Sequence, residues 1–407
     1  MNKRKLMYPR FLSERILSTS MPVILINGAR QVGKSTLVKT LFGGTHDYVT
    51  LDDPQTLFLV KRNPLNFVQN QLRPLIIDEI QRYPDILLAI KMIVDEKRQP
   101  RHFVLTGSVN VLGLKDLKDS LAGRMVVYNL WTLSQEEIQG KQSSFLESLF
   151  SEKLQIPSFD FSVDIFNRIQ RGGYPLVLLE KDPDSRREWI YAYITQLINK
   201  DIRDLSNIEG LTEIPNILGL LASRTGSLLN VNDLSRSLHI PHTTLKRYLS
   251  LLQSSFLFCP LNPWEKNFGK RLTKSGKSFL NDTAIVECLL NKDTRTDSVF
   301  FGHILENFVM LELVKQLSYK MRFVKLHHFR SVNGEEVDFV LEAMNGDVVA
   351  IEVKSSSQFS LKDTKGLQLL KQSLGEKFKQ GILLYRGQNM LPIESKICAV
   401  PVEALWS

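Results

Sequence analysis

The residues best suited to chemistry in this chain lie together near its N-terminus. They are Gly28, Ala29, Arg30, Gln31, Val32, Gly33, Lys34, Ser35 and Thr36. The run from Gly28 to Ser35 fits the phosphate-binding P-loop pattern G-x-x-x-x-G-K-[ST] at every fixed position. Backbone N–H groups in such a loop point at phosphate oxygens, and the positive end of the following helix favours the anion. We expect Lys34 to reach the β- and γ-phosphates of a nucleotide and Ser35 to bind Mg²⁺.

The sequence around this loop has the elements that such chemistry requires. The apolar run 23–26 predicts a buried strand, and 35–41 predicts a helix. Another buried strand is predicted at 74–77, and Asp78 and Glu79 follow it directly. Ligands of open α/β sheets bind at the carboxyl ends of the strands. Asp78 is therefore suited to the Mg²⁺ shell, and Glu79 to polarising the water that attacks the γ-phosphate.

Further strands with polar ends are predicted within 47–53, 101–108 and 125–128. Asp52 could touch the site, but the acidic pair before Pro54 has the chemistry of a turn and helix start, which we favour. Thr106 and Ser108 either contact the γ-phosphate or the attacking water, or they cap the next helix. Arg124 either contacts the γ-phosphate, in its own subunit or in a neighbour's, or is an ordinary surface residue.

Taken in order, these motifs resemble one family. They are NGARQVGKST at 27–36, LDDP at 51–54, IDEIQ at 77–81, LTGS at 105–108 and LAGR at 121–124. The family is that of bacterial and archaeal AAA-type ATPases whose C-terminal half carries a nuclease-like domain. The resemblance covers most of the chain and implies ATP and Mg²⁺ as cofactors. The residues that we expect to act in catalysis are Lys34, Glu79, Ser108 and Arg124.

Composition narrows the class of protein further. The 52 Lys and Arg against 43 Asp and Glu leave a net charge of +9, which favours either a polyanionic partner or a basic solvated surface. The three cysteines are widely spaced and make neither a zinc pattern nor a disulfide framework, as is typical of the cytoplasm. No run approaches 18 consecutive apolar residues and no signal-peptide core is evident, so we expect no membrane association.

At 407 residues the chain is expected to hold several domains. We expect an AAA-type P-loop ATPase domain at 1–137, a helical linker or lid at 138–225, a winged-helix domain at 226–292 and a nuclease-like domain at 293–407. The overall fold class is therefore α/β, with a helical linker and winged helix between two α/β domains.

The winged helix is expected from two short helices and a returning strand. Helices are predicted at 230–238 and 242–252, with a tight turn between them and a strand from 256. The second helix exposes Lys246 and Arg247, which suit the phosphates of DNA or RNA. Winged helices also serve as protein-packing modules, and that alternative stays open. The basic segment 266–277 is either a phosphate-facing wing or a solvated loop.

The C-terminal segment carries a second constellation of charged residues. A helix at 303–317 holds Glu306, a strand at 336–341 holds Asp338, and a strand at 348–354 holds Glu352 and Lys354. This D…E-x-K spacing is that of the PD-(D/E)xK, or restriction-endonuclease-like, fold. Asp338 and Glu352 are suited to Mg²⁺, and Lys354 to orienting a water or stabilising negative charge. A working nuclease, a nucleic-acid clamp without turnover, an allosteric ion site and a structural charge cluster all remain open.

The leading hypothesis is an Mg-ATP-dependent ATPase that couples hydrolysis to nucleic-acid binding or processing by its C-terminal half. One alternative is a nucleotide-dependent switch that binds protein partners. Another is an ATP-gated nuclease with a role in defence or as a toxin. A homo-oligomer is plausible, because arginine fingers in related ATPases often come from a neighbouring subunit.

Overall fold

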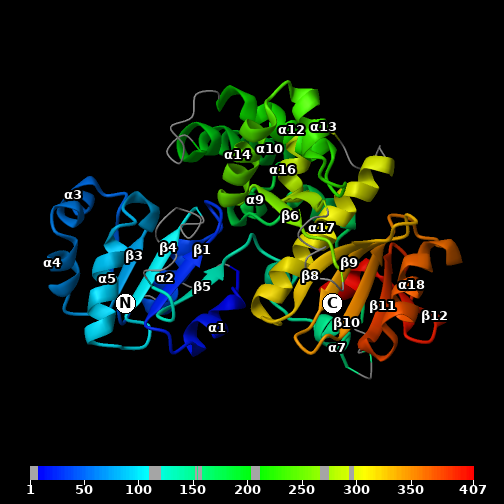
Figure 1. Cartoon of the computed structure of the whole chain (residues 1–407), viewed down its shortest axis with the longest axis horizontal. Helices are drawn as coiled ribbons and strands as arrows, with labels where there is room; N and C mark the ends of the chain where they lie inside the picture. The colour runs from blue at the N-terminus through cyan, green and yellow to red at the C-terminus, as the bar shows by residue number, and fades with distance from the viewer. Residues whose placement is uncertain are drawn as a thin grey trace. The chain divides into compact units, whose positions relative to one another are not determined.

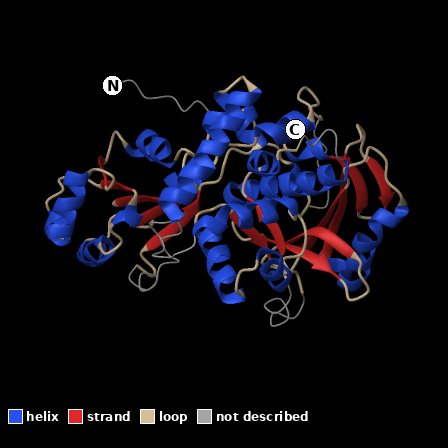
Figure 2. Cartoon of the chain, turned by 90° about the horizontal axis from the view of Figure 1, so that it is seen from above, coloured by secondary structure: helices blue, strands red, loops and turns tan. Residues whose placement is uncertain are grey.

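The computed structural model describes residues 8–109, 121–151, 154, 158–202, 211–265, 275–292 and 298–407. Two compact units are present: one comprises residues 1–133 with 254–256, and the other comprises 134–253 with 257–407. Within the described residues the strands form a five-stranded sheet, a six-stranded sheet and a two-stranded sheet (Figure 2). In this part of the chain no helix combines the length and apolar character needed to cross a membrane.

The N-terminal unit is built on the five-stranded sheet (Figure 1). Its strands are β1 (Val23–Asn27), β2 (Asp47–Thr50), β3 (Leu75–Asp78), β4 (Phe103–Gly107) and β5 (Met125–Asn129). They lie in the order β2-β3-β4-β1-β5, and every neighbouring pair is parallel. The expected parallel sheet is therefore confirmed. Because all strands run the same way, the carboxyl ends of β1, β3 and β4 meet at one edge.

Helices cover both faces of this sheet (Figure 1). They are α1 (Leu12–Ser18), α2 (Lys34–Phe42), α3 (Pro54–Arg62), α4 (Pro64–Gln69), the 3-10 turn η1 (Ile80–Arg82) and α5 (Ile86–Glu96). Helices α3 to α5 pack against alternate residues of β1, β3 and β4, such as Leu25, Ile77 and Leu105. Asp53 begins α3, since its side chain accepts a hydrogen bond from the Thr56 N–H at 2.8 Å. This confirms the turn and helix start that the sequence favoured there.

The second unit begins with helices and one hairpin. These are α6 (Gln135–Gln139), α7 (Phe145–Ser148), α8 (Ile165–Arg171), α9 (Pro175–Leu179), α10 (Pro183–Gln196), the π-helical η3 (Leu197–Ile202), the 3-10 turn η4 (Leu211–Glu213), α12 (Ile214–Ser223), α13 (Val231–Leu238), α14 (His242–Ser254), β6 (Phe258–Leu261), β7 (Lys277–Leu280) and α16 (Thr283–Leu290). Strands β6 and β7 are antiparallel. The two helices expected at 230–252 are thus present as α13 and α14, with β6 after them. The winged-helix assignment itself stays a prediction.

The same unit continues into the six-stranded sheet. Its elements are α17 (Ser298–Tyr319), β8 (Lys325–Arg330), β9 (Glu336–Glu342), β10 (Val348–Val353), η5 (Leu361–Thr364), α18 (Lys365–Leu374), η6 (Gly375–Lys377), β11 (Phe378–Tyr385), β12 (Leu391–Glu394), β13 (Ile397–Pro401) and η7 (Val402–Leu405). The strand order is β12-β13-β11-β10-β9-β8. Strands β8, β9 and β10 form an antiparallel meander, and β10, β11 and β13 are parallel. Helix α18 packs its apolar residues Leu367 and Leu370 on this sheet.

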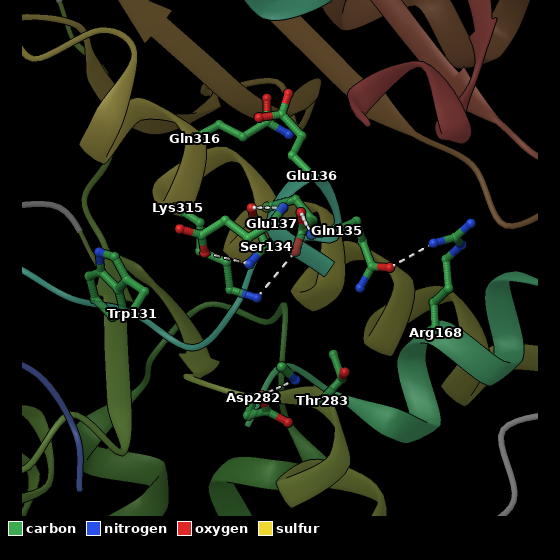
Figure 3. Close-up of polar contacts among 12 residues, drawn as sticks. Trp131, Ser134, Gln135, Glu136, Glu137, Arg168, Asp282, Thr283, Lys315 and Gln316 are labelled. Carbon is green, nitrogen blue, oxygen red and sulfur yellow. Dashed lines mark hydrogen bonds and ion pairs between the residues drawn. The ribbon is translucent and has the colours of Figure 1, made fainter. Parts of the chain in front are cut away.

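A buried polar cluster fixes the start of α6 against α17. The Gln135 N–H donates to Glu312 Oε2 at 2.8 Å, and Lys320 Nζ lies 2.6 Å from Glu136 Oε1. On the other side, Arg168 Nη1 donates to Gln135 Oε1 at 2.8 Å (Figure 3). Buried charges need such partners, because an unpaired one is strongly destabilising. The cluster therefore orients α6 within its unit.

Candidate nucleotide-binding site

The P-loop connects β1 to α2, as its sequence predicted. A Cβ atom on Gly28 would lie 2.2 Å from the backbone oxygen of Leu130, so only glycine fits there. Gly33 has φ +96°, a conformation that side chains disfavour, and α2 begins at the next residue. Gln31 also has a positive φ, of 63°. The loop backbone therefore takes the shape that lets amide groups approach a phosphate.

Lys34 lies inside this loop. Its side chain is buried, and Nζ donates to the backbone oxygens of Gly28 at 2.9 Å and Ala29 at 2.8 Å. These bonds hold the ammonium group within the loop. A cation held there suits an anionic phosphate, so the position fits the role that the motif assigns to Lys34.

Asp78 accepts hydrogen bonds from three different strands or helices. Ser35 Oγ donates to its two carboxylate oxygens at 3.0 and 2.9 Å, and Tyr48 Oη donates to Oδ2 at 2.6 Å. Thr106 Oγ1, at the end of β4, also donates to this carboxylate. Burial, together with the hydrogen bond to Asp78, raises the pKa of Tyr48. The structure thus brings together Ser35 and Asp78, the two residues expected to hold Mg²⁺.

Glu79 follows Asp78 in a left-handed backbone conformation, with φ 60° and ψ 49°. A non-glycine residue held there is strained by about 1–3 kcal/mol, which points to a functional constraint. Its N–H donates to Thr106 Oγ1 at 3.2 Å, and its carboxylate accepts from Ser108 Oγ at 3.0 Å. Gln81 Nε2 donates to the same carboxylate and to Ser108 Oγ at 2.7 Å. The catalytic roles of Glu79 and Ser108 stay predictions, but the two side chains are in contact.

Sequence reasoning missed Tyr48 and Gln81 as members of this site. Gln81 was visible only as the last letter of IDEIQ, and nothing in its spacing predicted that it would turn back to Glu79. Tyr48 lies in β2, where the pairing with β3 places Thr50 opposite Asp78. A tyrosine in an ordinary strand gives no signal that its hydroxyl will reach a carboxylate.

The structure does not bring Arg124 to this site. The backbone oxygen of Arg124 accepts from the Val23 N–H at 3.1 Å, so Arg124 lies where β1 starts and the P-loop lies where β1 ends. Five strand residues separate those edges by roughly 15 Å. Arg124 pairs instead with Asp95 of α5. The interpretation that Arg124 contacts the nucleotide of its own subunit is therefore wrong. Asp52 forms an ion pair with Arg82 at 2.9 Å.

The charged residues expected in the C-terminal half do lie together, around a lysine that was not expected there. Lys277 Nζ lies 2.7 Å from Glu306 Oε1 and 2.8 Å from Asp338 Oδ1. Glu352 pairs with Lys354 at 3.2 Å. The sequence allows two interpretations of the basic segment 266–277, a phosphate-facing wing and a solvated loop. For Lys277 both interpretations are wrong, because its side chain is only 5% exposed; residues 266–274 lie outside the described residues.

The pKa values in this cluster follow from burial and proximity. Burial and the neighbouring Asp338 raise the pKa of Glu306 to about 8 and raise that of Glu352 well above its ordinary value. Burial acts to lower the pKa of Lys277, but Asp338 and Glu306 outweigh it and hold the pKa above its ordinary value. Within the described ranges, no group of three or more His, Cys, Asp or Glu side chains is arranged to hold a metal ion.

Helix α14 presents a basic face. Lys246 and Arg247 are exposed, as is Thr243, whereas Leu245 and Tyr248 are buried. The residues expected to contact nucleic acid therefore lie on the exposed side of the helix.

Comparison with known families divides the chain into three segments. Residues 20–139 match the model of a family described as an AAA domain. Residues 163–296 and 301–405 each match a domain of unknown function. Together with the P-loop and the parallel sheet, the first match makes residues 20–139 a P-loop ATPase domain of the AAA type. The third match carries no functional description, so the nuclease-like interpretation stays a prediction.

Similar whole proteins are also known. An uncharacterized protein of Mycobacterium tuberculosis is 26% identical over 390 residues, which cover 94% of this chain and 81% of the relative. An uncharacterized protein of Methanocaldococcus jannaschii is 22% identical over 315 residues, which cover 70% of this chain and 67% of the relative. A Walker-type ATPase of Pyrococcus abyssi aligns with a TM-score of 0.41 and 17% identity, over 70% of this chain and 97% of that chain.

Proposed function

We propose that this protein binds ATP with Mg²⁺ and hydrolyses it. The observation that carries the proposal is the hydrogen bond, at 2.9 Å, between Ser35 Oγ and the Asp78 carboxylate beside the P-loop. A hydroxyl and a carboxylate are hard oxygen ligands of the kind that Mg²⁺ prefers, and both lie next to a lysine-bearing phosphate cradle. The close approach at Gly28 and the positive φ of Gly33 further support a phosphate ligand.

In this proposal the residues of the chain position the reactants and stabilise charge. The P-loop amides and Lys34 bind the phosphates, and Ser35 and Asp78 hold the metal, which supplies neutralisation of the phosphate charge. Glu79 accepts a hydrogen bond from the attacking water and orients it. Ser108, in contact with Glu79 at 3.0 Å, limits the rotation of that carboxylate.

A steady-state ATPase assay of the full chain tests the proposal. Wild type should release phosphate from Mg-ATP, and Glu79→Gln should bind ATP but turn it over about 10²–10⁴-fold more slowly, as loss of a catalytic base predicts. Thr40→Ala on the exposed side of α2 is a matched control and should keep full activity. Failure of wild type to bind ATP in Mg²⁺ buffer would refute the proposal.

A second part of the proposal concerns nucleic acid. The exposed pair Lys246 and Arg247 on α14 supports contact with the phosphates of DNA or RNA. DNA or RNA should then stimulate ATP hydrolysis, and Lys246→Ala with Arg247→Ala should abolish the stimulation without lowering the basal rate. An ATPase indifferent to both polymers would favour the alternative, a nucleotide-dependent switch that binds protein partners. We do not extend the proposal to cleavage of nucleic acid, because Lys277 lies among the carboxylates that cleavage would need.

Arg124 retains one proposed role, as a finger that reaches the nucleotide of a neighbouring subunit in a homo-oligomer. Its position at the edge opposite the P-loop leaves this role open. If it holds, mixing Arg124→Ala with Glu79→Gln should restore part of the activity that each variant lacks alone. A mixture as inactive as its components would exclude it.

A further inference from the structure

The C-terminal carboxylates surround a cation that belongs to the chain itself. Lys277 Nζ makes two ion pairs, with Glu306 of α17 and with Asp338 of β9, at 2.7 and 2.8 Å. The side chains of all three residues are at least 87% buried. The second oxygen of Asp338 accepts a hydrogen bond from the Val353 N–H at 3.0 Å. Both oxygens of Asp338 are therefore engaged within the protein.

This arrangement does not fit the Mg²⁺ ion that the D…E-x-K spacing predicted. A divalent ion shared by Asp338 and Glu352 needs carboxylate oxygens that point at it. Here one oxygen of Asp338 pairs with Lys277, and Oε1 of Glu352 pairs with Lys354 at 3.2 Å, whereas Oε2 of Glu352 is buried without a hydrogen-bond partner. A metal and an ammonium group at the same carboxylate would repel each other.

The backbone around Lys277 keeps its side chain in place. Lys277 is the first residue of β7 and pairs with Leu261 of β6, and an isolated bridge joins it to Leu228. Gly226 donates its N–H to Ser278 at 2.8 Å, and a Cβ on Gly226 would lie 2.9 Å from Glu306 Oε2. The lysine is thus held by strand pairing on two sides.

We propose that Lys277 is a built-in cation that takes the place of a divalent metal in the C-terminal carboxylate cluster. While β7 stays paired, the cluster excludes Mg²⁺ and has no metal with which to activate a water. The charge pattern of a nuclease is present, but its metal position is filled by a side chain. Removal of the ammonium group opens a divalent-cation site formed by Asp338 with Glu306 or Glu352.

Titration of the nucleotide-free full chain with Mn²⁺ tests this proposal. Lys277→Met should bind one more Mn²⁺ ion than wild type, and Lys277→Met with Asp338→Asn should lose that ion again. Lys371→Met is a matched control, because Lys371 also pairs with a glutamate, Glu394, in the same unit, at 3.1 Å. It should bind no additional ion. Mn²⁺ should also raise the melting temperature of Lys277→Met through a site that Asp338→Asn removes.

Two results would overturn the proposal. One is a Mn²⁺ site in wild type that Asp338→Asn abolishes, since a metal would then bind while Lys277 is present. The other is a folded Lys277→Met chain that gains no ion. If Lys277→Met does not fold, Lys277→Gln takes its place, because glutamine keeps hydrogen-bonding capacity without the charge. Comparison of Mn²⁺ binding by wild type and by Asp338→Asn tests the proposal without any variant of Lys277. None of these outcomes depends on ATP hydrolysis.

Discussion

Replacement of Lys34 by methionine tests the nucleotide site most directly. Methionine keeps most of the length and volume of the buried side chain but removes its charge. In the structure the ammonium group donates to the backbone oxygens of Gly28 and Ala29. When a triphosphate binds, we expect the same group to turn to the phosphate oxygens. The variant therefore changes the charge that meets the ligand and leaves the loop backbone in place.

The expected loss can be estimated from these contacts. A hydrogen bond between charged groups contributes about 1.5–3 kcal/mol net. Attraction between unit charges at 4 Å near a protein surface is about 4 kcal/mol. Part of this is offset, because Lys34 gives up two bonds to the loop when it turns to the ligand. A net loss of about 2–3 kcal/mol corresponds to a Kd for Mg-ATP weaker by roughly 30- to 150-fold.

Calorimetric titration with Mg-ATP measures this change. Lys39→Met is a matched control, because Lys39 lies on the same helix but is exposed, with Nζ 3.8 Å from the centre of the Tyr48 ring. It should alter the Kd by less than about threefold, as for an exposed charge. Equal affinities of wild type and a folded Lys34→Met would refute the assignment of this loop to phosphate binding.

Three further variants test other parts of the structure. Gly28→Ala should lower the free energy of unfolding by about 1–3 kcal/mol, because its Cβ would overlap the Leu130 backbone oxygen 2.2 Å away; urea denaturation measures the loss. Lys320→Met should cost about 3–5 kcal/mol, because it leaves the fully buried Glu136 carboxylate without the ammonium group 2.6 Å away; a cost below about 1 kcal/mol would show that this pair is dispensable. Burial raises the pKa of Glu403 from 4.5 to about 6. The folded chain therefore holds the proton of the Glu403 carboxyl group more tightly than the unfolded chain does. The free energy of unfolding consequently falls as the pH rises from 4.5 through 6. Glu403→Gln cannot lose this proton, so its free energy of unfolding should exceed that of wild type by about 2 kcal/mol at pH 7.5 and should equal it at pH 4. If the free energy of unfolding of both proteins depends on pH in the same way, the pKa of Glu403 is not raised.

The N-terminal site was largely predictable because each of its parts has a local sequence signal. The P-loop spacing predicts a strand, a turn and a helix within residues 23–42, and an acidic pair after an apolar run marks the end of a parallel strand. Parallel pairing of β3 with β4 then brings Asp78 and Thr106 together without any further information. Tyr48 and Gln81 escaped prediction because their roles depend on the direction of one side chain, which neither spacing nor periodicity encodes.

The carboxylates of the C-terminal cluster could be predicted from the sequence, but the lysine at its centre could not. Strand alternation predicted Glu352 and Lys354 on one face of their strand, and the ion pair between them agrees with that prediction. Lys277 comes from a hairpin distant in sequence, within a basic stretch that gives the same signal as any solvated loop. When a buried lysine lies among these carboxylates, the motif no longer indicates a metal site, because the acidic residues neutralise the lysine instead of binding a metal. The spacing of a motif predicts which side chains can lie close together. The cation that binds between them is known only from the contacts in the three-dimensional structure.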